Sequence, residues 1–466
     1  MKRGTEVEVV IEKFADRGKS LARLDGMVIF VNGAVPGDRV RARITRKKKK
    51  HAEAKLIELL EASELRSEPA CSHFGVCGGC KWQHIRYDVQ LDAKAQSVRE
   101  ALEHTGGLAS APMEPIVRAE SPLRYRNKME FSFSAARWLT EAEISSGTKL
   151  DRSFALGLHV PSNFEKVLDL NECHLAPPIA ERLVNRVRKM ARELEWMPWN
   201  VRTHKGYLRH LVVRMSARLP QVMVNLVTSW PDDDRMEKFA AMLSDEFPEV
   251  TTLINTVNSG VALTAYGKAT TIFGSGHIED RIGDKTFRIG PASFFQTNTV
   301  QAEKLYEVVA AYAELKSDDH VYDLYCGAGT IGIYLSDRVK SVVGIDIIPE
   351  AIRDAKANVT ANEISNCDFV VGDMGKLFNE AFVERNSRPD VLIVDPPRVG
   401  LHKDVVRQIA ELRAHRFVYV SCNPQTMARD IGLLSDVYAV DRVCPVDQFP
   451  QTHHVEAVAR LTAKNV

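Results

Sequence analysis

The chain has 466 residues, 45% of them hydrophobic and 26% charged, an ordinary composition that excludes a disordered or fibrous protein. No apolar run approaches the roughly 18 residues of a membrane span, and the first residues lack the apolar core of a signal peptide. We therefore expect neither a membrane protein nor a secreted one. At roughly 150 residues per domain, the length predicts about three domains. Eight cysteines are too few for a disulfide scaffold, so a cluster of them indicates metal binding or catalysis.

The first predicted domain, residues 1–62, is a small β-barrel. Short β-forming runs lie between Glu6 and Glu61, with turns at Asp25-Gly26 and at Pro36-Gly37-Asp38. The whole chain carries a net charge of +1, whereas residues 1–60 hold 15 Lys and Arg against 8 Asp and Glu, a local charge of +7. This excess, densest at Arg46–Lys50, is typical of a module that binds a polyanion, although a solvated lysine loop is the plainer interpretation.

A mixed α+β domain is predicted over residues 63–285. It opens with Cys71, Cys77 and Cys80, followed by a helix near Tyr87–His104 and by strand-like runs such as KMEFSFS and QVMVNLVTS. Three cysteines need a fourth ligand, and Cys173 is the nearest in sequence. Four thiolates hold either zinc or a 4Fe–4S cluster, so the residues alone leave both open.

The segment RYRNKMEF in this domain has two interpretations. Arg124, Arg126 and Lys128 alternate with Tyr125 and Met129, so the cations could follow RNA phosphates while Tyr125 stacks on a base. An ordinary edge strand with exposed cations explains the pattern equally well.

The third predicted domain, residues 286–466, is a doubly wound parallel sheet. Apolar strands alternate there with helical stretches, so we expect an α/β protein with a Rossmann-like sheet at its C-terminal end. A glycine loop follows the strand at 321–325, and its residues Gly327, Gly329 and Gly332 fit a dinucleotide as well as adenosyl-methionine. Asp346 ends the next strand, where its carboxylate can accept hydrogen bonds from ribose hydroxyls. Asp373 ends the third strand, where it is expected to meet the edge of the adenine ring.

Two later motifs favour a methyl donor over a dinucleotide. Asp395-Pro396-Pro397-Arg398 and Ser421-Cys422-Asn423-Pro424 each follow an apolar strand, where such sheets hold their chemistry. A helix N-terminus is expected to lower the pKa of the Cys422 thiol. Alone, a free cysteine is more often a small buried hydrophobe, and Glu456 near the C-terminus a solvated side chain. When the two motifs are considered with the glycine loop, Cys422 is predicted to be a nucleophile and Glu456 a general base. An enzyme that transfers hydride has no use for this pair of groups.

Methylation of pyrimidine carbon 5 explains why these groups occur together. A thiolate that adds to carbon 6 makes carbon 5 nucleophilic enough to attack a methyl sulfonium. A base must then remove the carbon 5 proton so that the thiolate can leave. Because a stacked base is out of reach, the target must lie in a loop or be flipped out of its helix.

Motifs along nearly the whole chain resemble the RNA uracil-5-methyltransferase family, and within it the branch that methylates 23S ribosomal RNA. The N-terminal GKSLARLDGMVIFVNGAVPGD resembles a TRAM domain, an RNA-binding barrel, and the other motifs stand in the family's order: CSHFGVCGGCKWQ, ASFFQTN, DLYCGAG, DPPRVG, SCNP and FPQTHHVE.

The resemblance implies roles for individual residues. Cys422 is the nucleophile and Glu456 the base, and Phe294 is expected to stack on the target base. Cys71, Cys77, Cys80 and Cys173 hold a 4Fe–4S cluster rather than zinc, and four ligands leave no open iron, so the cluster is structural or shapes the RNA site. By the resemblance, the residues that bind the methyl donor are Gln296, Tyr325, Asp346 and Asp395. The expected geometry of the sheet adds Gly327 and Asp373.

We therefore expect a cytoplasmic, monomeric methyltransferase that acts on uridine carbon 5 of 23S rRNA with adenosyl-methionine. The first alternative is a tRNA uracil-5-methyltransferase. Bacterial tRNA relatives typically lack the barrel and the cysteine cluster, but archaeal-type relatives carry both. The second alternative is a non-catalytic iron–sulfur RNA-binding protein on the same fold, against which the intact Cys422, Glu456 and glycine loop argue.

Overall fold

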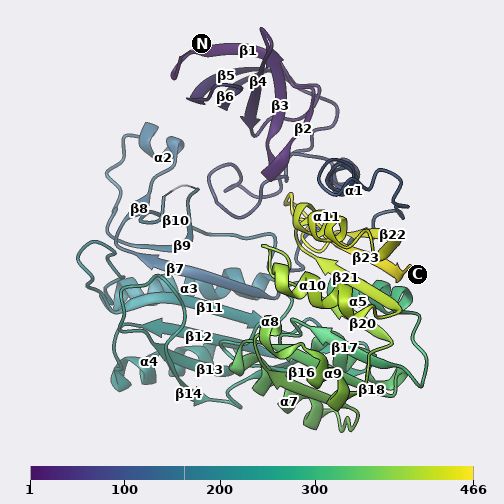
Figure 1. Cartoon of the computed structure of the whole chain (residues 1–466). Coiled ribbons are helices and arrows are strands. Elements are labelled where there is room, and N and C mark those ends of the chain that lie inside the picture. Colours follow the sequence, from purple (N-terminus) through teal and green to yellow (C-terminus); the bar gives the residue numbers. More distant parts are fainter. Residues whose placement is uncertain (1, 162, 465–466) are drawn as a thin grey trace.

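Three bodies make up the protein in this computed structural model, which describes residues 2–161 and 163–464. The N-terminal barrel stands above two larger bodies that lie side by side, a central sheet and a C-terminal sheet, with helix α1 (Tyr87–His104) beneath the barrel (Figure 1). Within the described residues, no helix is long and apolar enough to cross a membrane.

The barrel is a six-stranded sheet in the order β1-β5-β6-β4-β3-β2. In β5, Val40, Ala42 and Ile44 alternate with outward-facing residues and lie fully buried in the barrel core, because successive side chains of a strand point to opposite faces. The strands are β1 (Glu6–Val10), β2 (Lys13–Phe14), β3 (Ser20–Leu24), β4 (Met27–Asn32), β5 (Arg39–Lys47) and β6 (His51–Glu61).

The barrel's cations fall into two groups. The outward arginines of β5, namely Arg39, Arg41 and Arg43, form ion pairs with glutamates of β1 and β6. By contrast, no ion pair or side-chain hydrogen bond is formed within the described residues by any member of Arg46–Lys50, at the β5–β6 turn. The uncompensated positive charge of the barrel is therefore concentrated at that turn.

The central body is an eight-stranded sheet in the order β14-β13-β12-β11-β7-β9-β10-β8, with α3 and α4 packed on one face. The other face meets the C-terminal body through Met223 and Ile254, which join the core of the hairpin β15–β16. The predicted boundary between residues 285 and 286 falls inside β16. The elements are β7 (Lys128–Ser134), β8 (Arg137–Trp138), α2 (Glu141–Ser145), β9 (Ala155–His159), β10 (Val167–Asp169), α3 (Pro178–Glu193), β11 (Leu208–Met215), β12 (Val222–Thr228), α4 (Asp233–Glu246), β13 (Val250–Val257), β14 (Lys268–Phe273), β15 (Ile278–Ile282) and β16 (Lys285–Ile289).

Both interpretations of RYRNKMEF are wrong in one respect. Strand β7 lies between β9 and β11 and is not an edge. Arg124 donates to the carbonyls of Cys173 and Ala176, so it holds a loop of its own body and is not free for phosphate. The Tyr125 hydroxyl donates to the Pro450 carbonyl at 2.9 Å. These side chains join parts of the protein to one another.

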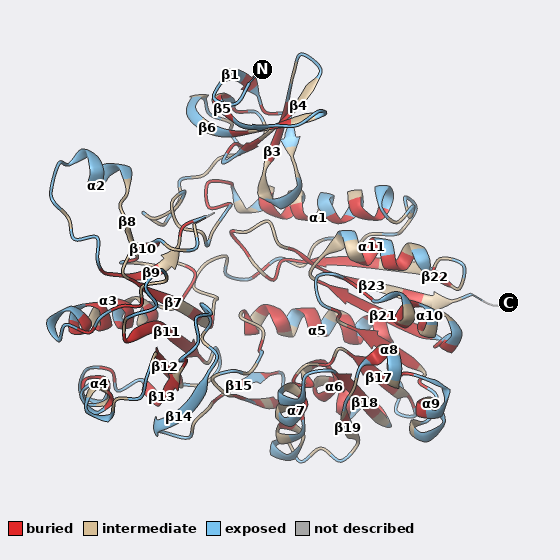
Figure 2. Cartoon of the chain, turned by 60° about the vertical axis from the view of Figure 1, so that its left-hand side comes forward, coloured by how far each residue is buried: buried red, intermediate tan, exposed pale blue. Residues whose placement is uncertain are grey.

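The C-terminal body is a seven-stranded sheet in the order β19-β18-β17-β20-β21-β23-β22. Helices α1, α10 and α11 cover one face and α5, α6 and α7 the other, which leaves the strands between them buried (Figure 2). The elements are α5 (Thr299–Ala313), β17 (His320–Leu324), α6 (Thr330–Leu335), β18 (Ser341–Asp346), α7 (Pro349–Ala361), β19 (Cys367–Val371), α8 (Met374–Leu377), α9 (Glu380–Asn386), β20 (Val391–Val394), α10 (Lys403–Leu412), β21 (Arg416–Ser421), α11 (Pro424–Leu433), β22 (Tyr438–Val446) and β23 (Glu456–Ala463).

Strand direction determines which residues meet at one edge. Strands β17 to β21 are mutually parallel, whereas β23 runs antiparallel to both β21 and β22. The carboxyl ends of the parallel strands therefore lie at the same edge as the first residue of β23. The predicted α/β fold, with an N-terminal barrel, a central α+β body and a Rossmann-like C-terminal sheet, is confirmed.

Candidate active site

The glycine loop turns sharply at the carboxyl end of β17. Tyr325 (φ 64°), Gly327 (φ 55°) and Gly329 (φ 74°) all adopt the left-handed conformation. A Cβ on Gly329 would lie 2.6 Å from Cζ of Phe369, so a side chain is excluded there. A Cβ on Gly327 would meet nothing within 4 Å, so the backbone at this position faces open space, as a loop that receives a ligand must.

Asp346 ends β18 beside this loop. Its carboxylate accepts hydrogen bonds from the backbone N–H of Gly327 at 2.9 Å and of Ile348 at 2.9 Å. Each oxygen thus has one protein donor and a further lone pair for ribose hydroxyls. Asp373 lies two residues beyond β19 and caps α8 by accepting from the N–H of Gly375. Burial raises the pKa of Tyr325 to about 12, and the carboxylates of Asp430, Asp373 and Asp346 add to this shift.

Gln296 lies between the central body and the C-terminal body. Its backbone carbonyl accepts from the side chain of Asn127 at 2.9 Å, and its Oε1 accepts from the buried amide of Gln448 at 3.5 Å. Phe294, two residues earlier, is 72% exposed. An exposed phenylalanine next to a positioned amide is available for stacking on a planar ligand.

Cys422 and Glu456 lie next to each other at the sheet edge. Cys422 follows β21, in the turn before α11, and Glu456 is the first residue of β23. The antiparallel register pairs Ser421 with Ala457. Cys422, which follows Ser421, therefore lies beside Glu456, which precedes Ala457. Glu456 is 5% exposed, whereas Cys422 is half-buried. The antiparallel direction of β23 thus brings the two side chains together.

The pKa values of the acidic side chains at this site are higher than the sequence predicts. Burial, and then the neighbouring Glu456 and Asp395, raise the pKa of the Cys422 thiol to about 12. The expected lowering by the helix N-terminus is therefore wrong for the ligand-free protein. Burial also raises the pKa of Glu456 to about 8, with a contribution from Asp395, and that of Asp395 to about 7.

Arg398 opposes these shifts, and sequence reasoning did not assign it a role. Its positive charge lowers the pKa of both Cys422 and Glu456, although burial dominates. Its carbonyl accepts from the Asn423 side chain at 2.8 Å, and its guanidinium lies 3.5 Å from Nδ1 of His454. The signal was available in the sequence, because Arg398 is the residue after Asp-Pro-Pro.

The four cysteines Cys71, Cys77, Cys80 and Cys173 come to one place. The N–H of Ser72 donates to Glu172 at 2.7 Å and that of Asn171 donates to His73 at 3.1 Å, which ties the 71–80 loop to the loop that carries Cys173. Burial raises the pKa of Cys77 to about 11 and of Cys80 to about 12, and the other thiols add to both shifts. Among the described residues, no three His, Cys, Asp or Glu side chains lie close enough for a single metal ion.

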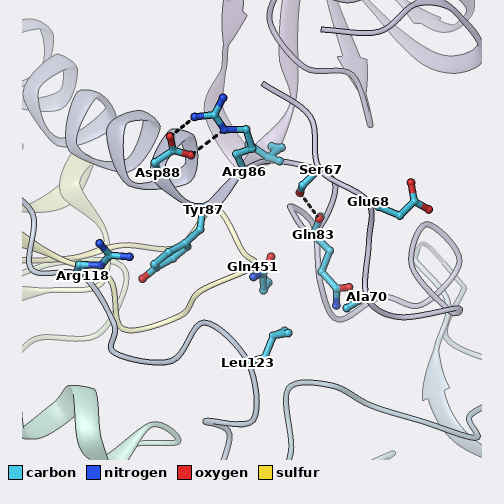
Figure 3. Close-up of a pocket in the computed structure, with 11 residues that line it drawn as sticks. Ser67, Glu68, Ala70, Gln83, Arg86, Tyr87, Asp88, Arg118, Leu123 and Gln451 are labelled. Carbon is cyan, nitrogen blue, oxygen red and sulfur yellow. Dashed lines mark hydrogen bonds and ion pairs between the residues drawn. The ribbon is translucent and has the colours of Figure 1, made fainter. Parts of the chain in front are cut away.

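A hollow of about 370 Å³ borders this cysteine loop. Figure 3 shows Tyr87, Arg118 and Gln451 on its wall, together with Ser67, Glu68 and Ala70 and with Gln83 and residues 85–88. Arg86 pairs with Asp88, and the wall holds one further cation, Arg118, and one further carboxylate, Glu68, so it carries no excess of either charge. The hollow is separate from the Cys422 edge, although Gln451 belongs to the loop that leads to Glu456.

Comparisons with known proteins agree with this arrangement. The family model of tRNA (uracil-5-)-methyltransferases matches residues 220–464, and the TRAM domain model matches residues 1–57. An uncharacterized RNA methyltransferase of Bacteroides thetaiotaomicron is 42% identical over 96% of this chain and 99% of its own length. Another, of Chlorobaculum tepidum, is 42% identical over 98% and 96%.

A solved structure extends the similarity to the whole fold. The tRNA (uracil-54, C5)-methyltransferase of Pyrococcus abyssi, solved with S-adenosyl-L-homocysteine, has a TM-score of 0.77 and 28% identity, and the match covers 98% of this chain and 100% of that one. The chain therefore belongs to the tRNA (uracil-5-)-methyltransferase family and is an adenosyl-methionine-dependent RNA uracil-5-methyltransferase with an N-terminal TRAM domain.

Proposed function

We propose that the protein methylates carbon 5 of a uridine in 23S ribosomal RNA through a covalent adduct with Cys422. The observation that carries this proposal is the side-by-side position of Cys422 and Glu456 at the edge where the glycine loop also lies. Covalent catalysis at a pyrimidine needs a nucleophile and a base within reach of adjacent ring carbons. Two neighbouring residues on strands of opposite direction meet that need.

The two side chains act in sequence on the uracil ring. As a thiolate, the Cys422 sulfur bonds to carbon 6, and the electrons of the ring double bond become available at carbon 5. Carbon 5 takes the methyl group as the bond between the methyl carbon and the donor sulfur breaks. Glu456 then accepts the carbon 5 proton, the double bond re-forms, and the carbon–sulfur bond breaks. A carboxylate with a pKa near 8 is a stronger proton acceptor than an exposed one, and this strength suits the removal of a weakly acidic carbon proton.

Adenosyl-methionine supplies the electrophilic methyl group when bound. The residues that would hold it are Asp346 at the ribose, Tyr325 and Asp373 towards the adenine, and Gln296, Gly327 and Asp395 at the remaining donor contacts. The open backbone at Gly327 and the available lone pairs of Asp346 support this assignment. Phe294 is proposed to stack on the flipped uracil, as its exposure allows.

We also propose that Cys71, Cys77, Cys80 and Cys173 hold a 4Fe–4S cluster. The raised pKa values of Cys77 and Cys80 mean that thiols at this depth need a cationic partner to become thiolates. Four thiolates satisfy one such cluster completely. The cluster would hold the 71–80 loop against the central body, and we assign it no step of the reaction.

The RNA substrate is tested by mapping 5-methyluridine in 23S rRNA and tRNA from cells with and without the protein. Loss of the mark from 23S rRNA alone is the expected result. Loss from tRNA alone would support the alternative substrate, which the similarity to the Pyrococcus abyssi enzyme favours. An unchanged pattern in both RNAs would contradict the proposed activity. Because its substrate is RNA, we propose that the enzyme works in the cytoplasm.

The barrel's part in RNA binding has a matched test. Replacing Lys47, Lys48, Lys49 and Lys50 by Gln should weaken RNA binding and flatten its salt dependence, because each lost phosphate contact lowers the slope by about one. The control replaces Arg39, Arg41 and Arg43 by Gln, because glutamates already neutralise these side chains. Equal salt slopes for the two variants would contradict a role of the β5–β6 turn in binding RNA.

A further inference from the structure

Helix α1 contacts the loop of residues 447–455, which joins β22 to β23 and so leads to Glu456. Lys94 and Asp447 form an ion pair in which both side chains are fully buried. Lys94 also donates to the carbonyl of Phe449 at 3.0 Å, and the Tyr87 hydroxyl donates to Asp447 at 2.8 Å. The first two turns of α1 thus contact the first residues of the loop with two directional groups.

A second contact lies four residues further along the loop. The side-chain amide of Gln90 makes two hydrogen bonds to Gln451, because it donates to Oε1 of Gln451 at 3.1 Å and accepts from the Gln451 backbone N–H at 3.0 Å. The Gln451 carbonyl accepts from the N–H groups of Lys81 and Trp82, at 2.9 and 3.0 Å. Gln451 has a φ of 65°, a conformation that a residue with a side chain keeps only when its surroundings impose it.

Stability alone does not explain these contacts, because burying an ion pair costs free energy. A buried ion pair is often no more stabilising than apolar residues of the same shape, since both charges lose their hydration. Burial lowers the pKa of Lys94, which reflects that cost. What such a pair does supply is direction, because it fixes the position of the backbone to which its members belong.

From this geometry we infer that Lys94 and Gln90 are positioning residues for proton abstraction by Glu456. They hold residues 447–451, and Asp447 directly follows Val446, the residue that pairs with Glu456 between β22 and β23, so a displaced loop moves the carboxylate relative to Cys422. The inference rests on the proposed function of Glu456. The same loop connects the cysteine segment to the active site, because Lys81 and Trp82 directly follow Cys80 and donate hydrogen bonds to Gln451.

The test replaces the ion pair by apolar residues of similar size, Lys94→Met with Asp447→Leu, in the full-length protein. Methyl transfer and adduct breakdown are timed separately in single turnovers with RNA. We expect breakdown to slow by about 10-fold or more, the scale set by small misplacements of catalytic groups, so that the covalent RNA adduct accumulates. Adenosyl-methionine binding should stay unchanged.

The matched control is a buried pair at the opposite edge of the same sheet, Arg416→Met with Asp319→Leu. It should alter stability without causing adduct to accumulate. Hydrogen exchange gives a readout independent of activity: amides of residues 447–455 should exchange faster in the Lys94 variant only. If the Lys94 variant does not fold, Gln90→Glu serves instead, because it keeps the acceptor for the Gln451 N–H.

A folded variant with wild-type adduct breakdown would overturn the inference, as would equal accumulation in the Arg416 control. Failure of the wild type to form any adduct or product with RNA would instead overturn the proposed function. In that case the exchange measurement still decides whether α1 holds the loop.

Discussion

Two regions of the molecule contain buried thiols with the same shift in pKa and different surroundings. Burial raises the pKa of Cys422 and of Cys80 to about 12. The neighbours of Cys422 are the carboxylates of Glu456 and Asp395 with the cation Arg398, whereas those of Cys80 are three further thiols. Under the functions proposed above, a thiolate at Cys422 is needed only while substrate is bound, whereas four thiolates together need a permanent positive partner. The same burial would then serve transient chemistry in one region and metal binding in the other.

The largest expected effect is at Cys422. Cys422→Ala should reduce methylation by ~10⁴-fold or more, as removal of a covalent nucleophile does, while adenosyl-methionine binding is retained. Methyl incorporation into RNA and calorimetric donor binding measure the two properties. Cys444→Ala, a buried cysteine of β22, is the control and should keep its activity. Turnover in the Cys422 variant would remove the distinction between the two regions.

Glu456→Gln should stop the reaction one step later. The amide cannot accept the carbon 5 proton, so a methylated RNA–protein adduct should persist on a denaturing gel, and turnover should fall by about 10²- to 10⁴-fold. Because the Glu456 carboxylate helps to raise the pKa of Cys422, that pKa should also fall. The pH dependence of alkylation by iodoacetamide measures it. Normal product release without adduct would exclude Glu456 as the base.

Cys173→Ser tests the second region. Anaerobically purified wild type should carry about four irons per chain, and the variant should lose most of them, since a serine oxygen is a poorer ligand for iron. Iron and sulfide analysis with the visible spectrum measures the loss, and Cys367→Ser provides a control outside the cysteine loop. Stoichiometric zinc without iron in the wild type would replace the proposed cluster, and an unchanged spectrum in the variant would exclude Cys173 as a ligand.

The smallest expected effect is on the pH dependence of stability. The folded-state pKa of Glu456, about 8, lies above the unfolded value near 4.5, so the folded state binds the extra proton between these values. Its contribution to stability is present below pH 4.5 and is lost as the pH rises through 8. Glu456→Gln should therefore gain stability relative to wild type between pH 5 and pH 8, by up to a few kcal/mol. Urea unfolding at both pH values measures the gain, and a constant difference would mean that the carboxyl group is not buried as described.

The sequence predicted those parts of the site that follow from strand order. In a parallel sheet every strand ends at the same edge, so motifs at strand ends predict that edge without knowledge of any distance. Asp346, Asp395 and Cys422 could be placed in this way. The resemblance to the RNA uracil-5-methyltransferase family with a TRAM domain was confirmed, because its motifs extend over nearly the whole chain.

What the sequence missed depends on contacts between distant segments. The pKa of Cys422 was predicted in the wrong direction, because a local helix terminus is visible in a sequence while burial beside Glu456 is not. The free cations of the barrel could not be told from the paired ones, since cross-strand register decides which arginines meet glutamates. Arg124 was interpreted either as an RNA contact or as an exposed edge-strand cation, but it holds the Cys173 loop some fifty residues away in sequence.

The reversed direction of β23 has a consequence for the synthesis and folding of the enzyme. Strand β23 lies between β21 and β22, and among the strands of the described residues β22 pairs with β23 alone, so the two form one hairpin at this edge of the sheet. Because a chain is synthesised from its N-terminus, Cys422 and the glycine loop leave the ribosome before Glu456 does. If Cys422 and Glu456 have the roles proposed above, a nascent chain has the nucleophile but not the base until that hairpin closes. Completion of the last strand would then be the step that allows methylated RNA to be released.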